Sequence, residues 1–131
     1  IKNYIRKRPM YFLEMWKKSL GRKNVSEYKI RVDKIDAPLL IISGGDDKLW
    51  PSGNFNDEIQ KERNNENDIY LSYKKAGHFI SFPYSFYQSP ANVHMDLDGM
   101  IINFGGTKHE NAQAAEDSLG KILAFLEQNN G

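Results

Sequence analysis

The clearest pattern along the chain is a continuous run of aliphatic residues, PLLIIS, at residues 38–43. Apolar residues that follow one another without alternation are typical of a strand covered on both faces, as in a parallel sheet beneath helices. Two glycines end this run, and Pro51 and Ser52 follow them. We predict that Ser52 is the N-cap of a helix that ends near the NNEND segment. Residues 69–75, IYLSYKK, alternate between apolar and polar side chains and predict a second strand.

A strand, a helix and a strand in this order predict a βαβ unit with parallel strands. The predicted fold class is therefore α/β, with parallel strands and flanking helices. Residues 108–128 predict a further helix, and its apolar face is formed by Ala112, Ala115, Leu119, Ile122 and Leu126. In open α/β sheets, ligands bind at the edge where the strands have their carboxyl ends, so functional residues are expected there.

Two other segments have weaker patterns. The first part of the chain predicts a polar, helical approach segment, in which Pro9 and Gly21 delimit a helix with aromatic side chains. We expect those aromatic side chains to pack in a core or as a cap, and not to bind a ligand. Residues 79–107 are too long and too apolar for an ordinary connection, and they predict an ordered loop packed over another part of the protein.

Composition excludes several classes of function. The chain has 131 residues, 18 Lys and Arg against 17 Asp and Glu, and no cysteine. This balance does not predict a nucleic-acid partner, and a thiol nucleophile or a cysteine zinc site within the chain is excluded. No apolar run approaches the roughly 18–20 residues of a membrane span, and no signal-peptide pattern appears, so we expect a cytoplasmic protein without a membrane partner.

His94, Asp96 and Asp98 lie close together in the sequence, but their spacing does not match a calcium-binding loop. We interpret this stretch as a solvated turn. No metal and no cofactor are therefore predicted.

A carboxylate and a histidine follow the two predicted strands. Asp47 lies just after the first strand and His78 just after the second, 31 positions later. Neighbouring parallel strands are about 4.8 Å apart, so loops leaving them at one edge can bring these side chains within hydrogen-bonding reach. A carboxylate that orients a histidine leaves the other ring nitrogen free to act as a general base.

The same residues match two short motifs. Gly44, Asp47 and Pro51 meet the pattern G-x-x-D-x-x-x-P, and Ala76, Gly77 and His78 form A-G-H. These stretches resemble the acid loop and the histidine loop of α/β-hydrolases, and the chain order of acid before histidine agrees with that fold.

The resemblance extends to a family. The stretches PLLIISGGDDKLWPS, AGHFI and GGT with ENAQAAEDSLGKILAFL look like the C-terminal domain shared by acyl-CoA thioesterases and bile acid-CoA:amino acid N-acyltransferase. The likeness runs from about residue 30 to the end of the chain. It implies that Asp47 is the acid and His78 the base of a catalytic triad, with Asp46 a neighbour. It also implies that Gly105 and Gly106 form a tight turn into the last helix.

The nucleophile of that family is absent. No G-x-S/C-x-G motif occurs, and Ser43 and Ser52 lie in other contexts. Because the chain begins at Ile1 and lacks this motif, we expect residues 1–131 to be the C-terminal portion of an incomplete α/β-hydrolase fold. Residues 1–30 would be the approach segment and residues 31–131 the part with the acid loop, the histidine loop and the final helix. The expected partners are an acyl thioester and an N-terminal remainder carrying the nucleophile, without which the chain should be inactive.

Alternatives remain open at this point. The same acid and base would serve another α/β-hydrolase, such as a carboxylesterase or a peptidase, because substrate choice depends on loops. A non-catalytic binding module is a further alternative, and a receiver-like phosphoacceptor ranks last. The aromatic side chains of residues 79–107 fit either a substrate pocket beside His78 or packing against the missing part.

Overall fold

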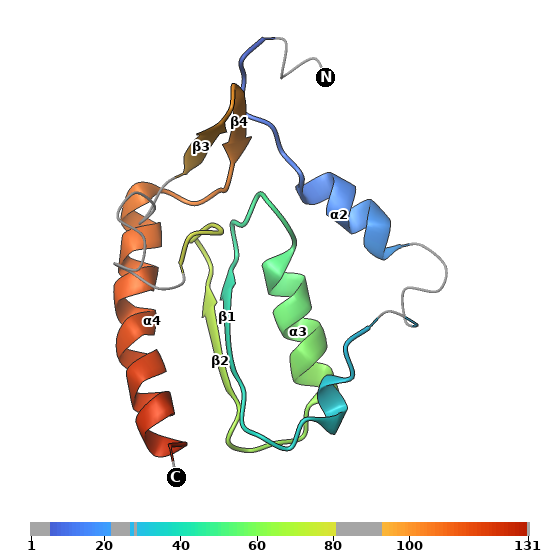
Figure 1. Cartoon of the computed structure of the whole chain (residues 1–131), viewed down its shortest axis with the longest axis vertical. Coiled ribbons are helices and arrows are strands. Elements are labelled where there is room, and N and C mark those ends of the chain that lie inside the picture. Colours follow the sequence, from blue (N-terminus) through green and yellow to red (C-terminus); the bar gives the residue numbers. More distant parts are fainter. Residues whose placement is uncertain (1–5, 22–26, 28, 81–92, 131) are drawn as a thin grey trace.

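The computed structural model describes residues 6–21, 27, 29–80 and 93–130 of the chain. It has a mixed α/β architecture (Figure 1). In chain order the elements are α2 (Leu13–Leu20), the 3-10 turn η2 (Val32–Lys34), β1 (Leu40–Gly44), α3 (Ser52–Glu62), β2 (Ile69–Tyr73), β3 (His94–Leu97), β4 (Met100–Asn103) and α4 (Lys108–Gln128).

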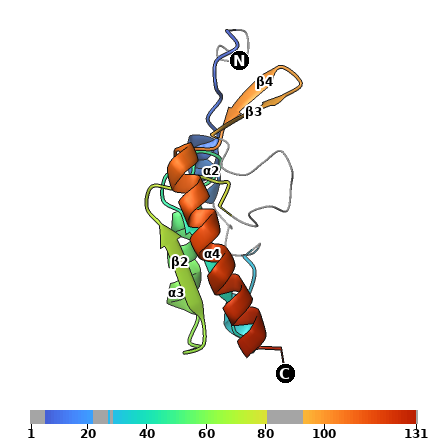
Figure 2. The ribbon, with the colours of Figure 1, turned by 90° about the vertical axis from the view of Figure 1, so that its left-hand side faces the viewer.

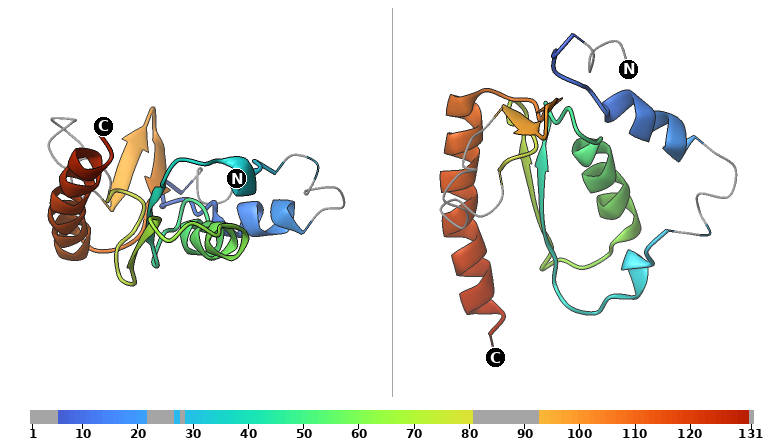
Figure 3. Two further views of the ribbon diagram at one scale, coloured as in Figure 1. Left: turned by 90° about the horizontal axis from the view of Figure 1, so that it is seen from below. Right: turned by 45° about the horizontal axis from the view of Figure 1, so that its top comes forward.

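The predicted βαβ unit is confirmed. β1 and β2 pair in parallel, from Leu40 opposite Ile69 to Gly44 opposite Tyr73. Helices α3 and α4 lie on opposite sides of this pair, and the views in Figures 1 and 3 agree on this arrangement. A small core of Ala76, Ile80 and Ala114 is buried between the sheet and α4. The continuous aliphatic run of β1 is explained by this arrangement, because both faces of the strand are covered.

Part of the predicted loop at residues 79–107 is instead a β-hairpin. β3 and β4 pair antiparallel, with His94 opposite Asn103 (Figure 2). Asp98 and Gly99 connect the strands with φ angles of 56° and 83°. An Asp-Gly pair with two positive φ angles is typical of a tight hairpin turn, and the strand before it alternates between polar and apolar residues. Residues 81–92, with most of the aromatic side chains of that segment, lie outside the described residues.

The N-terminal segment adds to this hairpin. Met10 forms a parallel bridge with Ile102 of β4, and its backbone N–H donates to the Ile101 carbonyl over 2.8 Å. Helix α2 follows, and its first residue, Leu13, donates to the carbonyl of Lys48 over 3.1 Å. Of the expected core and cap positions for the aromatic residues of this segment, none is buried in the described chain. Tyr11 is 56% exposed, and Trp16 has an edge-on ring contact with the half-exposed Trp50.

Two sequence predictions about the helices are wrong in detail. Ser52 is the first residue of α3 and not its N-cap; its hydroxyl donates to the Gly44 carbonyl over 3.0 Å. In α4, Ala112 and Leu126 are exposed, whereas the buried residues are Asn111, Ala114, Ala115 and Ser118. The buried face is offset from the predicted one because Asn111 and Ser118 hydrogen-bond the backbone of neighbouring segments and therefore face inward.

Candidate active site

The acid loop leaves β1 at a point of very close backbone packing. A Cβ atom on Gly44 would lie 2.1 Å from the carbonyl oxygen of Gly77, so only glycine permits this contact. Asp47 follows, with its side chain 3% exposed. Its Oδ1 atom accepts hydrogen bonds from the backbone N–H groups of Leu49 and Trp50 over 2.8 and 3.1 Å. These two bonds fix the orientation of the carboxylate.

The histidine loop brings the second predicted residue to this carboxylate. Nδ1 of His78 lies 3.0 Å from Oδ2 of Asp47. Three aromatic rings surround the imidazole, with centroids 4.9 Å away for Trp50 and 5.8 Å away for Phe79 and Phe104. The imidazole remains 22% exposed, so a reacting group can reach it. A carboxylate that accepts from Nδ1 favours the tautomer with a free lone pair on Nε2, which is the arrangement of a general base.

One backbone carbonyl joins the two loops. The oxygen of Phe104, the residue after β4, accepts from the N–H of His78 over 2.8 Å and from the N–H of Lys48 over 3.4 Å. An antiparallel bridge between Asp47 and Gly105 adds to this contact. The hairpin therefore holds the acid loop and the histidine loop in register with each other. A backbone acceptor leaves no side-chain signature, so this contact could not be predicted from the sequence.

Asp46 has different partners from Asp47. Its Oδ2 atom accepts from the N–H of Gly106 over 3.0 Å, and Oδ1 forms an ion pair with Lys48. Burial raises the pKa of Asp46, but the hydrogen bonds from Lys48 and Gly106 together outweigh it and hold the pKa below its usual value. Asp46 thus anchors the turn before α4.

Gly105 and Gly106 form the tight turn expected at this position. Their φ angles are 82° and 68°, in the region that favours glycine. Thr107 then caps α4 by accepting from the N–H of Glu110 over 3.1 Å. Asn111, in the first turns of this helix, reaches back to the loops and was not identified from the sequence. Because the polar residues Glu110 and Gln113 lie beside it, no sequence signal set Asn111 apart.

The serines of the chain that flank the acid loop are engaged in structural contacts. Ser43 is 1% exposed and accepts from the side-chain amide of Asn56 over 2.8 Å. Ser52 hydrogen-bonds both the N–H and the carbonyl of Gly44.

Asp96 accepts from the N–H of Gly99 inside the hairpin turn. No group of three metal-ligating side chains occurs within the described residues, and no helix described there is long and apolar enough to span a membrane.

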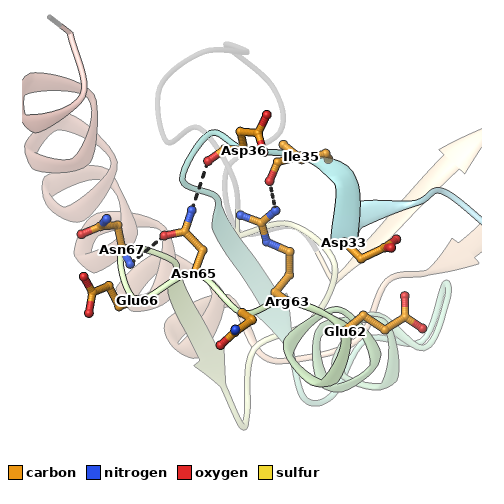
Figure 4. A pocket seen from close by; sticks show the side chains of 9 residues that line it. Asp33, Ile35, Asp36, Glu62, Arg63, Asn65, Glu66 and Asn67 are labelled. Atoms are coloured by element: carbon orange, nitrogen blue, oxygen red, sulfur yellow. Dashed lines mark hydrogen bonds between the residues drawn. The ribbon is translucent and has the colours of Figure 1, made fainter.

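A concave region lies at the ends of the strands that are opposite to Asp47 and His78. It has a volume of about 530 Å³ and surrounds Arg63, at the end of α3 (Figure 4). The guanidinium donates to the carbonyls of Val32, Ile35 and Ala37 and to both oxygens of Asp68. Because these partners use its donors, Arg63 acts here as a clamp between the segment before β1 and the segment before β2.

Comparisons with known proteins agree with the resemblance seen in the sequence. Residues 4–131 match the family model described as "BAAT / Acyl-CoA thioester hydrolase C terminal". Acyl-coenzyme A thioesterase 1 of Mus musculus is 33% identical over 105 residues, which are 78% of this chain and 25% of that protein. Acyl-coenzyme A thioesterase 6 of Homo sapiens is 32% identical over 119 residues, 88% of this chain and 27% of that protein.

A third relative, the peroxisomal succinyl-coenzyme A thioesterase of Mus musculus, is 31% identical over 106 residues, 78% of this chain and 24% of that protein. The chain thus spans about a quarter of the length of the curated relatives that it matches. The family model covers nearly all of the chain, including both loops of the site. The chain belongs to the BAAT / acyl-CoA thioester hydrolase C-terminal family.

Proposed function

We propose that the complete protein carrying this chain hydrolyses acyl-CoA thioesters, with Asp47 and His78 as the acid and base of its catalytic triad. The observation that carries the proposal is the 3.0 Å contact between Nδ1 of His78 and Oδ2 of the buried Asp47. The names of the relatives, which are acyl-coenzyme A thioesterases, support hydrolysis of a thioester as the reaction.

In this mechanism, Nε2 of His78 accepts the proton of a serine or cysteine nucleophile that attacks the thioester carbonyl carbon. The carbon–sulfur bond to coenzyme A breaks, and the imidazolium returns the proton to the leaving thiolate. Water then attacks the carbonyl carbon of the acyl-enzyme, and Nε2 again accepts the proton. The bond to the nucleophile breaks, the carboxylic acid leaves, and the imidazolium returns the proton to the nucleophile. Asp47 stabilises the imidazolium at each stage.

The nucleophile and the oxyanion-hole donors would come from an N-terminal remainder of the same protein. We place residues 1–131 at the C-terminal end of an α/β-hydrolase fold, with residues 1–30 as the approach segment and residues 31–131 as the part with the site. The parallel β1–β2 pair, whose carboxyl ends carry Asp47 and His78, supports this placement.

The cytoplasm remains the predicted compartment. Among the relatives, two are named mitochondrial and one peroxisomal, so organelles are the other candidates. Cell fractionation of the complete protein would decide between them.

The direct test measures thiol release from a panel of acyl-CoA esters by the complete protein. We expect release by the unmodified protein and a loss of at least about 10³-fold in kcat for His78→Ala. The matched control is His109→Ala, which removes an exposed histidine of α4 and should leave kcat unchanged. If His78→Ala retained most of its turnover, the triad assignment would be wrong.

If the unmodified protein released no thiol from any ester, hydrolysis of acyl thioesters would be excluded. The remaining candidates would then be acyl transfer to an amine, hydrolysis of other esters or peptides, and non-catalytic binding. Amine acceptors, simple esters and peptides are therefore included in the same panel. Turnover with any of them would indicate acyl transfer or another hydrolysis, and no turnover would leave non-catalytic binding.

A further inference from the structure

A fully buried asparagine connects helix α4 to the histidine loop. Asn111 is 0% exposed. Its Oδ1 atom accepts from the N–H of Gly77 over 2.7 Å, and its Nδ2 atom donates to the carbonyl of Gly105 over 3.3 Å. A buried amide is costly unless its polar atoms are paired, and here both are paired with backbone groups of the two segments beside the site.

These two bonds lie next to the backbone bond that holds His78. Gly77 precedes His78, and Phe104 precedes Gly105. The N–H of His78 donates to the Phe104 carbonyl over 2.8 Å. The side chain of Asn111 and the Phe104 carbonyl therefore fasten the same two segments to each other. The position of the imidazole relative to Asp47 depends on this contact.

The glycines beside Asn111 allow a very close approach of the backbone segments. A Cβ atom on Gly77 would lie 2.3 Å from the carbonyl oxygen of Gly105. A Cβ atom on Gly106 would lie 2.1 Å from Oδ1 of Asn111 and 2.5 Å from the N–H nitrogen of Gly77. The glycines allow the segments to touch, and the amide of Asn111 sets the distance at which they do so.

We propose that Asn111 is a positioning residue for His78. It acts through Gly77, keeping the histidine loop against the Gly105 turn so that Nδ1 stays in contact with Asp47. The catalytic consequence rests on the proposed function of the complete protein. A displacement of about 1 Å at a reacting group can lower the rate about 10²-fold, so a small shift of the loop is enough to reduce turnover.

The test compares Asn111→Ala with Asn56→Ala in the complete protein. Asn56 is a second buried asparagine, and its amide donates to Ser43 within β1. Both variants remove a buried amide and create a cavity. We expect kcat for thiol release to fall about 10–100-fold in Asn111→Ala with KM changed less than about twofold, and kcat to stay near the wild-type value in Asn56→Ala. Equal kcat values for the two folded variants would overturn the proposal.

If Asn111→Ala does not fold, Asn111→Thr replaces it, because threonine fills nearly the same volume and its shorter side chain cannot reach both Gly77 and Gly105. A kcat equal to that of the wild type would then overturn the proposal. Amide hydrogen exchange gives a readout that does not need activity. Exchange at Gly77 and His78 should accelerate in the Asn111 variants and not in Asn56→Ala, and unchanged exchange there contradicts the inference even if the protein hydrolyses no thioester.

Discussion

Asp47 and His78 meet through a 3.0 Å contact between Oδ2 and Nδ1, although 31 positions separate them in the sequence. The other carboxylate oxygen is held by the N–H groups of Leu49 and Trp50. With both oxygens engaged, the carboxylate has one orientation and selects one histidine tautomer. Asp46, next to it in the chain, makes its hydrogen bonds with Gly106 and Lys48 instead.

This difference predicts unequal effects of two matched substitutions. Asp47→Asn should lower kcat of the complete protein by on the order of 10³–10⁴-fold, because an amide at this position stabilises the wrong histidine tautomer. Asp46→Asn should cost less than about tenfold, because it affects only the anchoring of the turn. Steady-state kinetics of thiol release measures both, and a larger loss in Asp46→Asn would reverse the assignment of the acid.

The close contact between the histidine loop and the Gly105 turn predicts that one added methyl group destabilises the fold. Gly77→Ala would place a Cβ atom 2.3 Å from backbone atoms of Gly105, which cannot move without shifting the site. Overpacking of this kind costs about 1–3 kcal/mol of unfolding free energy. Gly120→Ala is the control, because a Cβ atom there meets nothing within 4 Å, and in a helix alanine is more stable than glycine by about 0.5–1 kcal/mol. Urea denaturation should therefore give changes of opposite sign for the two variants.

The clamp at the other end of the sheet predicts that lysine cannot replace Arg63. The side chains of Arg63 and Asp68 are 3% and 1% exposed, and the guanidinium reaches three carbonyls as well as the carboxylate. An ammonium group has no planar fork and cannot reach all of these acceptors, so Arg63→Lys should lower the melting temperature. Lys29→Ala, which removes the half-exposed partner of Glu58 and Glu62, should leave it nearly unchanged. Equal melting temperatures for the two variants would contradict the role of the clamp.

Asp68 predicts a loss of stability in acid. Its pKa is lowered from 3.8 to about 2, mainly by the hydrogen bonds from Arg63. Burial raises the pKa, whereas hydrogen bonds from the N–H of Leu39 and the hydroxyl of Tyr70 lower it further. The folded state therefore binds fewer protons than the unfolded state in this range. The resulting stabilisation, about 2 kcal/mol, is complete above about pH 4 and disappears as the pH falls towards 2. Denaturation curves of Asp68→Asn should show a shallower decline than the wild type between these pH values; parallel declines would exclude Asp68 as the source.

The sequence predicted the βαβ unit and the meeting of Asp47 with His78 because both depend on strong, simple patterns. The aliphatic run of β1 has no polar interruption, and parallel strands bring their carboxyl ends to one edge. The hairpin of β3 and β4 was missed because each strand has only four residues. The Asp98-Gly99 pair was its clearest local signal, and it was interpreted as a solvated turn.

Asn111 and Ser52 show a different limit of sequence analysis. Both are polar residues whose partners are backbone atoms of distant segments, and such partners cannot be read from residue types. A serine before a helix is a common N-cap, yet Ser52 uses its hydroxyl to close the acid loop on Gly44. Asparagine is usually exposed in proteins, yet Asn111 lies at the buried contact. Tertiary hydrogen bonds overrode local preference in both cases.

The Phe104 carbonyl, which accepts from both His78 and Lys48, has a consequence for experiments on this family. An alanine scan replaces side chains and leaves every carbonyl oxygen in place, so it would report Phe104 only as an aromatic neighbour of His78. No variant of such a scan would remove either partner of the bond between the His78 N–H and the Phe104 carbonyl. Removal of the His78 N–H by an amide-to-ester replacement would be needed to reveal it. The geometry of this site is thus held partly by atoms common to all residues, which side-chain substitution does not test.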